Sequence, residues 1–116
     1  MVTAQDVREL ALTLPRAYEV LVRDRVKFRV GRLVFLSLSP DETVLGFGYP
    51  KEGREALIAG EPEKFHLPIA SDMRYNWVRV WLSAIDHDEM RELVIDSWRM
   101  SIPKTIYAEY VKNHPL

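Results

Sequence analysis

Apolar residues near the start of the chain recur with the spacing of one helical face. These positions are Val7, Leu10, Ala11 and Leu14. Thr3 precedes them as a capping residue, and Asp6 follows three residues later in a weak version of a capping box. Pro15 biases the residue before it away from the helical conformation. The pattern therefore predicts a helix near residues 3–14.

From Tyr18 to Tyr49 the apolar period changes to two, which is the period of a half-buried strand. The alternation is clearest where Val26, Phe28 and Val30 are interleaved with Arg25, Lys27 and Arg29. Gly31-Arg32 and the segment 40–42 have the composition of tight turns. Strands are therefore expected near 18–30, 33–38 and 43–49, as consecutive members of an antiparallel meander.

The second half of the chain returns to helices, with one strand among them. A short helix is expected near 51–59, a strand near 76–82, and further helices near 86–100 and 103–112. The predicted order is α-β-β-β-α-β-α-α. Helices and strands are segregated rather than alternating, so the pattern favours a two-layer α+β sandwich with helices packed on an antiparallel sheet. We expect one domain over residues 1–116.

Composition narrows the class of protein. There are no cysteines, which excludes disulfides and thiolate metal sites. No apolar run is long enough to span a bilayer, and the first residues lack the pattern of a signal peptide, so we expect a cytoplasmic protein without a membrane partner. The 16 basic and 17 acidic residues nearly balance. A nucleic-acid ligand would therefore need a local basic patch.

Several short segments, in this order and spacing, resemble the MmcQ/YjbR family. They are Leu14-Pro15, Phe28-Arg29-Val30 with Gly31-Arg32, the segment up to Phe65 and Pro68, Trp77-Val78-Arg79-Val80, Asp96-Ser97-Trp98 and Pro103-Lys104. Arg32 stands where the family usually has lysine, and Asn76 where it usually has glycine. The resemblance implies a small two-layer α/β domain, similar to frataxin-like or secretion-chaperone-like architecture. The family is often labelled DNA-binding, and no catalytic residue set accompanies that label.

A row of cations is the first candidate for a binding surface. Its members are Arg23, Arg25, Lys27 and Arg29, which share one parity, and Arg32 in the following turn. On one face of a strand they could follow a phosphate backbone. The alternative is a solvated strand face, where Lys and Arg also discourage edge-to-edge association. Asp24 has the opposite parity, and a bend there would interrupt the row.

Trp77, Arg79 and Trp81 form the second candidate, on the face opposite Val78 and Val80. Aromatic rings beside a cation can stack on nucleic-acid bases. The same residue types are frequent at protein interfaces. A third alternative places both tryptophans in the core, with the arginine reaching its edge.

Two more candidates belong to the last part of the chain. Arg99 and Lys104 could add to a surface patch. Trp98, directly before Arg99, is expected to pack a helix onto the sheet.

The sequence contains no supported catalytic or metal-binding pattern. The segment 86–89 combines carboxylates with His87, but capping and the helix dipole account for acidic residues at a helix start. His66 lies in an expected loop without an obvious carboxylate partner, and Ser97 lacks the glycines of a nucleophile elbow. We therefore expect no enzyme, no metal and no cofactor.

Two hypotheses about function follow. The first is a non-enzymatic binding module with nucleic acid, DNA in particular, as its ligand. The second is a protein-interaction or adaptor domain that acts as a homodimer. The four methionines and three tryptophans are compatible with the second.

Overall fold

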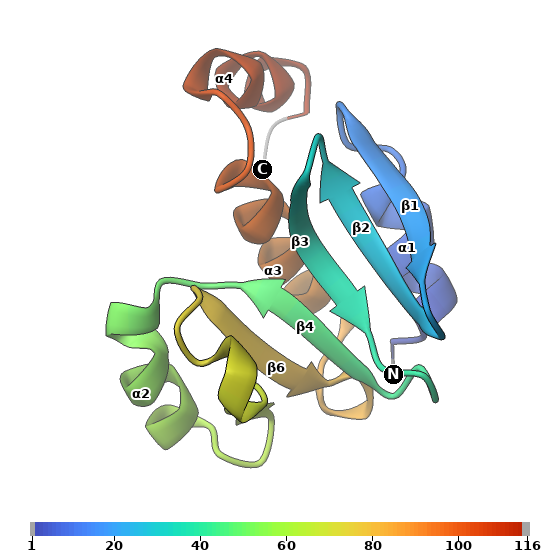
Figure 1. Cartoon of the computed structure of the whole chain (residues 1–116). Coiled ribbons are helices and arrows are strands. Elements are labelled where there is room, and N and C mark those ends of the chain that lie inside the picture. The colour runs from blue at the N-terminus through green and yellow to red at the C-terminus, as the bar shows by residue number, and fades with distance from the viewer. Residues whose placement is uncertain (1, 115–116) are drawn as a thin grey trace.

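An antiparallel sheet of six strands organises the chain in the computed structural model, which describes residues 2–114 (Figure 1). The helices are α1 (Ala4–Ala11), α2 (Lys51–Gly60), α3 (His87–Arg99) and α4 (Lys104–Asn113). The strands are β1 (Ala17–Val22), β2 (Arg25–Val30), β3 (Leu33–Leu38), β4 (Val44–Gly48), β5 (Phe65–His66) and β6 (Trp77–Trp81). Two short 3₁₀ helices are η1 (Ala70–Asp72) and η2 (Leu82–Ala84).

The strands lie in the order β1-β2-β3-β4-β6-β5, and every neighbouring pair is antiparallel. This confirms the α+β class predicted from the sequence. The region near 18–30 differs from the expectation in one respect, because it forms the hairpin β1–β2 instead of one strand. Arg23 adopts a φ of 60°, which reverses the chain at Arg23-Asp24 and removes Arg23 from the strand. The two-residue strand β5 was not predicted.

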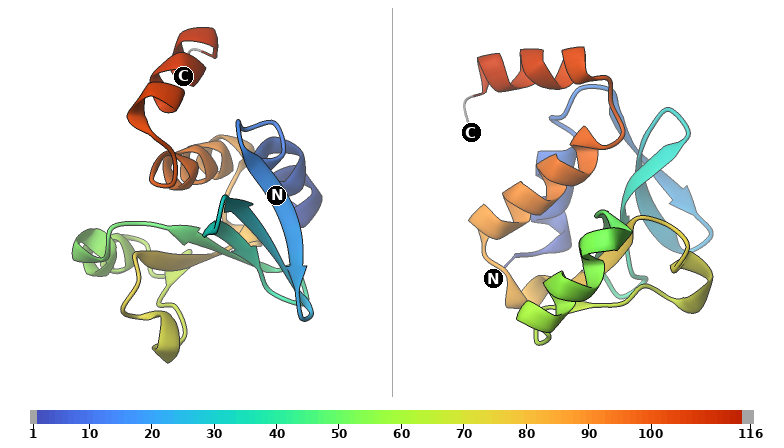
Figure 2. Two further views of the ribbon diagram at one scale, coloured as in Figure 1. Left: turned by 45° about the horizontal axis from the view of Figure 1, so that its top comes forward. Right: turned by 90° about the vertical axis from the view of Figure 1, so that its left-hand side faces the viewer.

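The helices cover one face of the sheet and leave the other open. α3 packs on β3 and β4, and α1 lies beside α3 on the same face (Figures 1 and 2). α2 contacts β5 and β6 at one end of the sheet, and α4 extends past the end of α3. The apolar side chains between the sheet and the helices form the core.

The burial of β6 decides which of its faces is the core. Val78 and Val80 are fully buried, whereas Trp81 is 44% exposed. Since successive side chains of a strand alternate between faces, Trp77, Arg79 and Trp81 belong to the open face. The alternative that placed these tryptophans in the core is therefore wrong.

Trp98, by contrast, is in the core as expected. It has no exposed surface, and its indole Nε1 donates a hydrogen bond of 3.0 Å to the carbonyl of Pro15. The ring of Tyr110 packs edge-on against it, with 4.9 Å between ring centroids. This contact attaches α4 to α3.

Ser97 joins α3 to the sheet where β3 and β4 separate. The pairing of these strands stops at Leu36 and Phe47, beside a bulge in which Phe35 is the extra residue. The Ser97 hydroxyl donates to the Phe35 carbonyl and accepts a 2.7 Å hydrogen bond from the amide of Gly48. One buried side chain thus satisfies two backbone groups that lie beyond the end of the β3–β4 pairing.

We expect Ser97→Ala to lower the free energy of unfolding by about 2 kcal/mol, because it leaves a buried carbonyl and a half-buried amide without a partner. Urea denaturation followed by tryptophan fluorescence measures this loss. Ser83→Ala, at an exposed serine, is the matched control and should change the stability by less than about 0.5 kcal/mol. Equal stabilities of the two variants would contradict the role given to Ser97.

Candidate functional site

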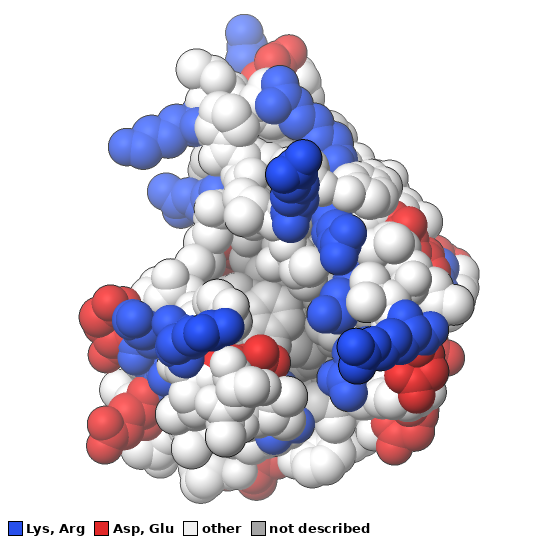
Figure 3. Space-filling model, viewed as in Figure 1, with Lys and Arg blue, Asp and Glu red and all other residues white. Residues whose placement is uncertain are grey.

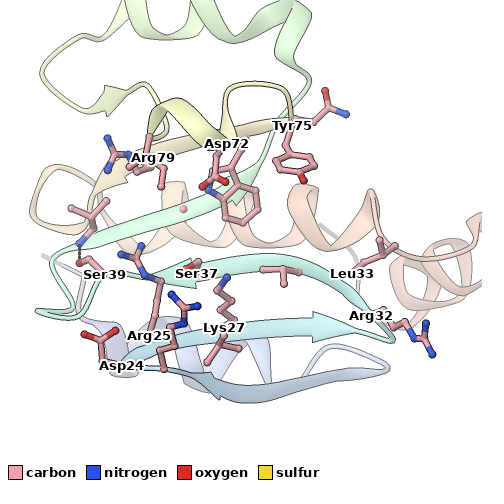
Figure 4. Close-up of a pocket in the computed structure, with 18 residues that line it drawn as sticks. Asp24, Arg25, Lys27, Arg32, Leu33, Ser37, Ser39, Asp72, Tyr75 and Arg79 are labelled. Atoms are coloured by element: carbon pink, nitrogen blue, oxygen red, sulfur yellow. Dashed lines mark hydrogen bonds between the residues drawn. The ribbon is translucent and has the colours of Figure 1, made fainter.

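A groove crosses the open face of the sheet along one register row. Lys27 pairs with Ser37, Ser37 with Gly46, and Gly46 with Arg79. The two middle residues are small and leave room above the sheet, while the two outer residues are long cations. The groove encloses about 910 Å³ and opens to solvent (Figures 3 and 4).

Cations outnumber carboxylates around this groove. The lining cations are Arg23, Arg25, Lys27, Arg32 and Arg79, and the lining carboxylates are Asp24 and Asp72. The five ion pairs found among the described residues involve none of these seven side chains. Figure 3 shows Lys and Arg side chains on both sides of the hollow. The groove is therefore locally positive in a chain whose formal net charge is −1.

The opposite wall is the segment from Ile69 to Trp77, which carries aromatic rings. The indole of Trp77 lies against Gly46, where an added Cβ atom would be only 2.7 Å from the indole Nε1. Glycine at this position is thus required for the close approach of the ring. Tyr75 is 52% exposed. Figure 4 shows Tyr75 and Asp72 extending over the sheet toward Arg25 and Lys27.

Arg54 of α2 holds this wall in place. Its guanidinium donates hydrogen bonds of 3.1 Å to the carbonyls of Tyr75 and Trp77, and one of 2.9 Å to the carbonyl of Met73. The residue is buried and has no carboxylate partner among residues 2–114. The planar donor group of arginine fits such a set of carbonyls, because several N–H groups diverge from one rigid fork.

The structure brings together most of the residues expected from the sequence, but not all. Arg29 is half-buried outside the groove, and its Nε has no partner within the described residues. Arg99 lies over the ring of Tyr107, with 4.6 Å from its Cζ to the ring centroid, and also lies outside the groove. Lys104 is exposed at the start of α4, away from the lining residues.

Trp81 contributes to a separate cluster at the end of the sheet. Its ring stacks on that of His66, with 4.8 Å between centroids. The pKa of the His66 imidazole lies below its ordinary value because burial disfavours the charged form, and because the Arg79 guanidinium repels a second positive charge. The imidazole is therefore neutral at pH 7 and adds no charge beside the groove.

The acidic segment at the start of α3 acts as a cap. The Asp86 carboxylate accepts a 2.8 Å hydrogen bond from the amide of Glu89. His87 Nε2 lies 3.3 Å from Asp6 Oδ2, but this imidazole is 64% exposed and lies outside the groove. Within residues 2–114 we find no group of three or more His, Asp or Glu side chains that could hold a metal ion. None of the described helices is long and apolar enough to cross a membrane.

Sequence reasoning missed the wall residues Arg54, Asp72 and Tyr75. They come from a helix and a loop whose position over the sheet depends on long-range contacts. Gly46 was the one local signal, since a glycine inside an apolar strand often marks a close approach of another group.

The comparisons with known proteins agree on the fold. The family model YjbR matches residues 12–100. The crystal structure of Deinococcus radiodurans protein DR2400, with the family-model domain DUF419, superposes with a TM-score of 0.75 at 21% sequence identity. The match covers 94% of this chain and 88% of that chain. The comparison with curated proteins gave no match.

We expect Arg54→Met to lower the free energy of unfolding by about 2 kcal/mol or more, because three carbonyls lose a charged donor in a buried place. Amide exchange should speed up in residues 73–77. Arg54→Lys should be intermediate, since one ammonium cannot reach all three carbonyls in the same geometry. Urea denaturation and hydrogen exchange measure both effects. Glu55→Met, exposed on the same helix, is the control, and a matching loss there would contradict the anchoring role.

Proposed function

The chain belongs to the YjbR family, and from this premise and the geometry of the groove we propose that it is a non-enzymatic binding module for single-stranded nucleic acid. One observation carries the proposal. The groove has four cations without an ion-pair partner along β2 and its two turns, and aromatic rings together with Arg79 along the other side. A nucleic-acid strand presents the same two chemistries, phosphate and base, side by side.

The cationic wall supports binding of the phosphates. Arg25 and Lys27 project from β2, and Arg23 and Arg32 extend the row through the turns at its two ends. Neutralising phosphates releases counterions from the strand, which provides most of the sequence-independent affinity. Because these cations are not bound to carboxylates of the described residues, no ion pair has to break first.

The aromatic wall favours a single strand over a duplex. Trp77 and the face of the Tyr75 ring opposite Arg74, whose Cζ lies 4.8 Å from the ring centroid, can stack only on a base whose own face is uncovered. The bases of a duplex are already stacked on each other, whereas those of a single strand can turn toward the protein. Stacking on aromatic side chains contributes about 1–3 kcal/mol per base.

One lining residue of the groove has a strained backbone, as do Arg16 and Glu42 outside it. The two hairpins beside it have the same two-residue length, and the second has Gly31 at its first turn position, with a φ of 58°. The first hairpin has Arg23 at that position, with a φ of 60°. A side chain there costs about 1–2 kcal/mol.

We expect fluorescence anisotropy to detect binding of a labelled, mixed-sequence single strand at low salt. The affinity should fall steeply as salt rises. Arg25→Gln with Lys27→Gln should weaken binding by about tenfold and reduce the salt slope by about 0.7 for each lost phosphate contact. A duplex of the same sequence should bind more weakly, because its base faces are covered.

Arg99→Gln with Lys104→Gln is the matched control, since it removes the same charge outside the groove and should leave binding unchanged. Equal effects of the two double variants, or no binding at low salt, would contradict the proposal. Leu67, Ile69 and Trp81 are each exposed by 44–51% near β5 and β6. Absence of binding together with self-association in sedimentation would favour the protein-interaction alternative, with these residues as its surface.

We expect Arg23→Gly to raise the stability by about 0.5–1 kcal/mol, because glycine adopts a positive φ without strain. The same substitution should weaken strand binding, because it removes a lining cation. Arg32→Gly is the control, since Arg32 also lines the groove but does not have a positive φ. It should weaken binding without raising the stability. Urea denaturation and anisotropy on the same samples separate the two effects, and a destabilised Arg23→Gly variant would show that no strain is stored there.

A further inference from the structure

One carboxylate in the groove does not fit a surface that only follows phosphates. Asp72 lines the groove from η1, opposite the cations of β2 (Figure 4). It takes part in none of the ion pairs of residues 2–114. The local turn uses its backbone, since its amide donates to the Ile69 carbonyl and its carbonyl accepts from the Tyr75 amide. The carboxylate is therefore free to bind a ligand.

The position of this carboxylate orients a ligand across the groove. It repels phosphate, and Arg79 on its own side of the groove is held by a 2.9 Å hydrogen bond from its Nε to the Leu67 carbonyl. The phosphates of a bound strand therefore lie along the β2 side with Arg25 and Lys27. The base then lies on the other side, against Trp77 and Tyr75, with its polar edge near Asp72. The group that meets Asp72 must donate hydrogen bonds, because an ionised carboxylate only accepts them.

Guanine is the base whose edge matches a carboxylate. Its N1–H and its 2-amino group are neighbouring donors, and they can bond to the two carboxylate oxygens at once. Adenine and cytosine each place a ring-nitrogen acceptor beside the amino donor, and thymine flanks its single N–H with two carbonyls. In these three bases an acceptor would face the carboxylate.

We propose that Asp72 makes the groove selective for guanine, with Trp77 and Tyr75 as the stacking surface. This inference rests on the proposed binding of single-stranded nucleic acid and adds the identity of the base. The phosphate cations provide affinity for any strand, and Asp72 distinguishes the bases.

The test compares short oligothymidine strands that carry one central guanine, inosine or adenine, measured by anisotropy against the full chain. A single guanine avoids self-association of the strands. We expect the guanine strand to bind about tenfold more tightly than the adenine strand, with inosine between them because it lacks the 2-amino group. Asp72→Asn should remove this preference and leave the affinity for plain oligothymidine equal or higher, since a negative charge near phosphate is lost.

The outcomes separate this inference from the proposed function. Equal binding of all strands, or an unchanged preference in Asp72→Asn, would overturn the guanine subsite while the strand-binding function stands. No binding of any strand would overturn both. Competition with free GMP and AMP adds a second measurement. Stronger competition by GMP supports the subsite, and GMP binding as tight as that of the strand would identify a free nucleotide as the source of the guanine. Equal competition by both nucleotides would count against the subsite.

Discussion

The hydroxyl of Ser97 fixes how the helical layer meets the sheet. It bonds to β3 and β4 at the point where their ladder ends, so α3 cannot slide along the sheet without leaving a buried carbonyl and a half-buried amide unsatisfied. Trp98, the next residue, then packs in the core and attaches α4. With α1 beside α3, the helical layer is complete on one face. The other face stays open, and the groove lies on it.

A second buried polar group shapes the open face. Arg54 reaches from α2 to three carbonyls of the segment that forms the aromatic wall. A buried cation held only by carbonyls is uncommon, because charge is costly to remove from water. Here the buried charge has a structural role, because its hydrogen bonds hold the segment that carries Trp77 and Tyr75 opposite β2. The groove thus depends on two buried side chains, Ser97 of α3 behind the sheet and Arg54 of α2 at its end.

The formal net charge of the chain does not indicate its positive groove, because the charged side chains are unevenly distributed over the surface. Several acidic residues are used in caps and ion pairs outside the groove, such as Asp86 at the start of α3 and Glu19 with Arg8. The cations around the groove are left without such partners in the described chain. A chain with a net charge near zero can therefore present a positive surface to an anionic ligand.

Local spacing of apolar residues was enough to predict the periodic parts of this protein. The apolar stripe of α1, the alternation of β2 and the buried valines of β6 follow from local spacing, which is why the α+β class could be predicted. The tertiary structure decided the rest. Periodicity shows that one side of a strand is buried, but it does not show which element covers that side. The position of Trp77 on the open face was therefore decided by where the helices pack. The chain reversal at Arg23-Asp24 depended on a positive φ that arginine rarely adopts. Asp72 and Lys27 are far apart in sequence, and they meet across the groove only because β6 pairs with β4 and the loop before β6 folds over the sheet.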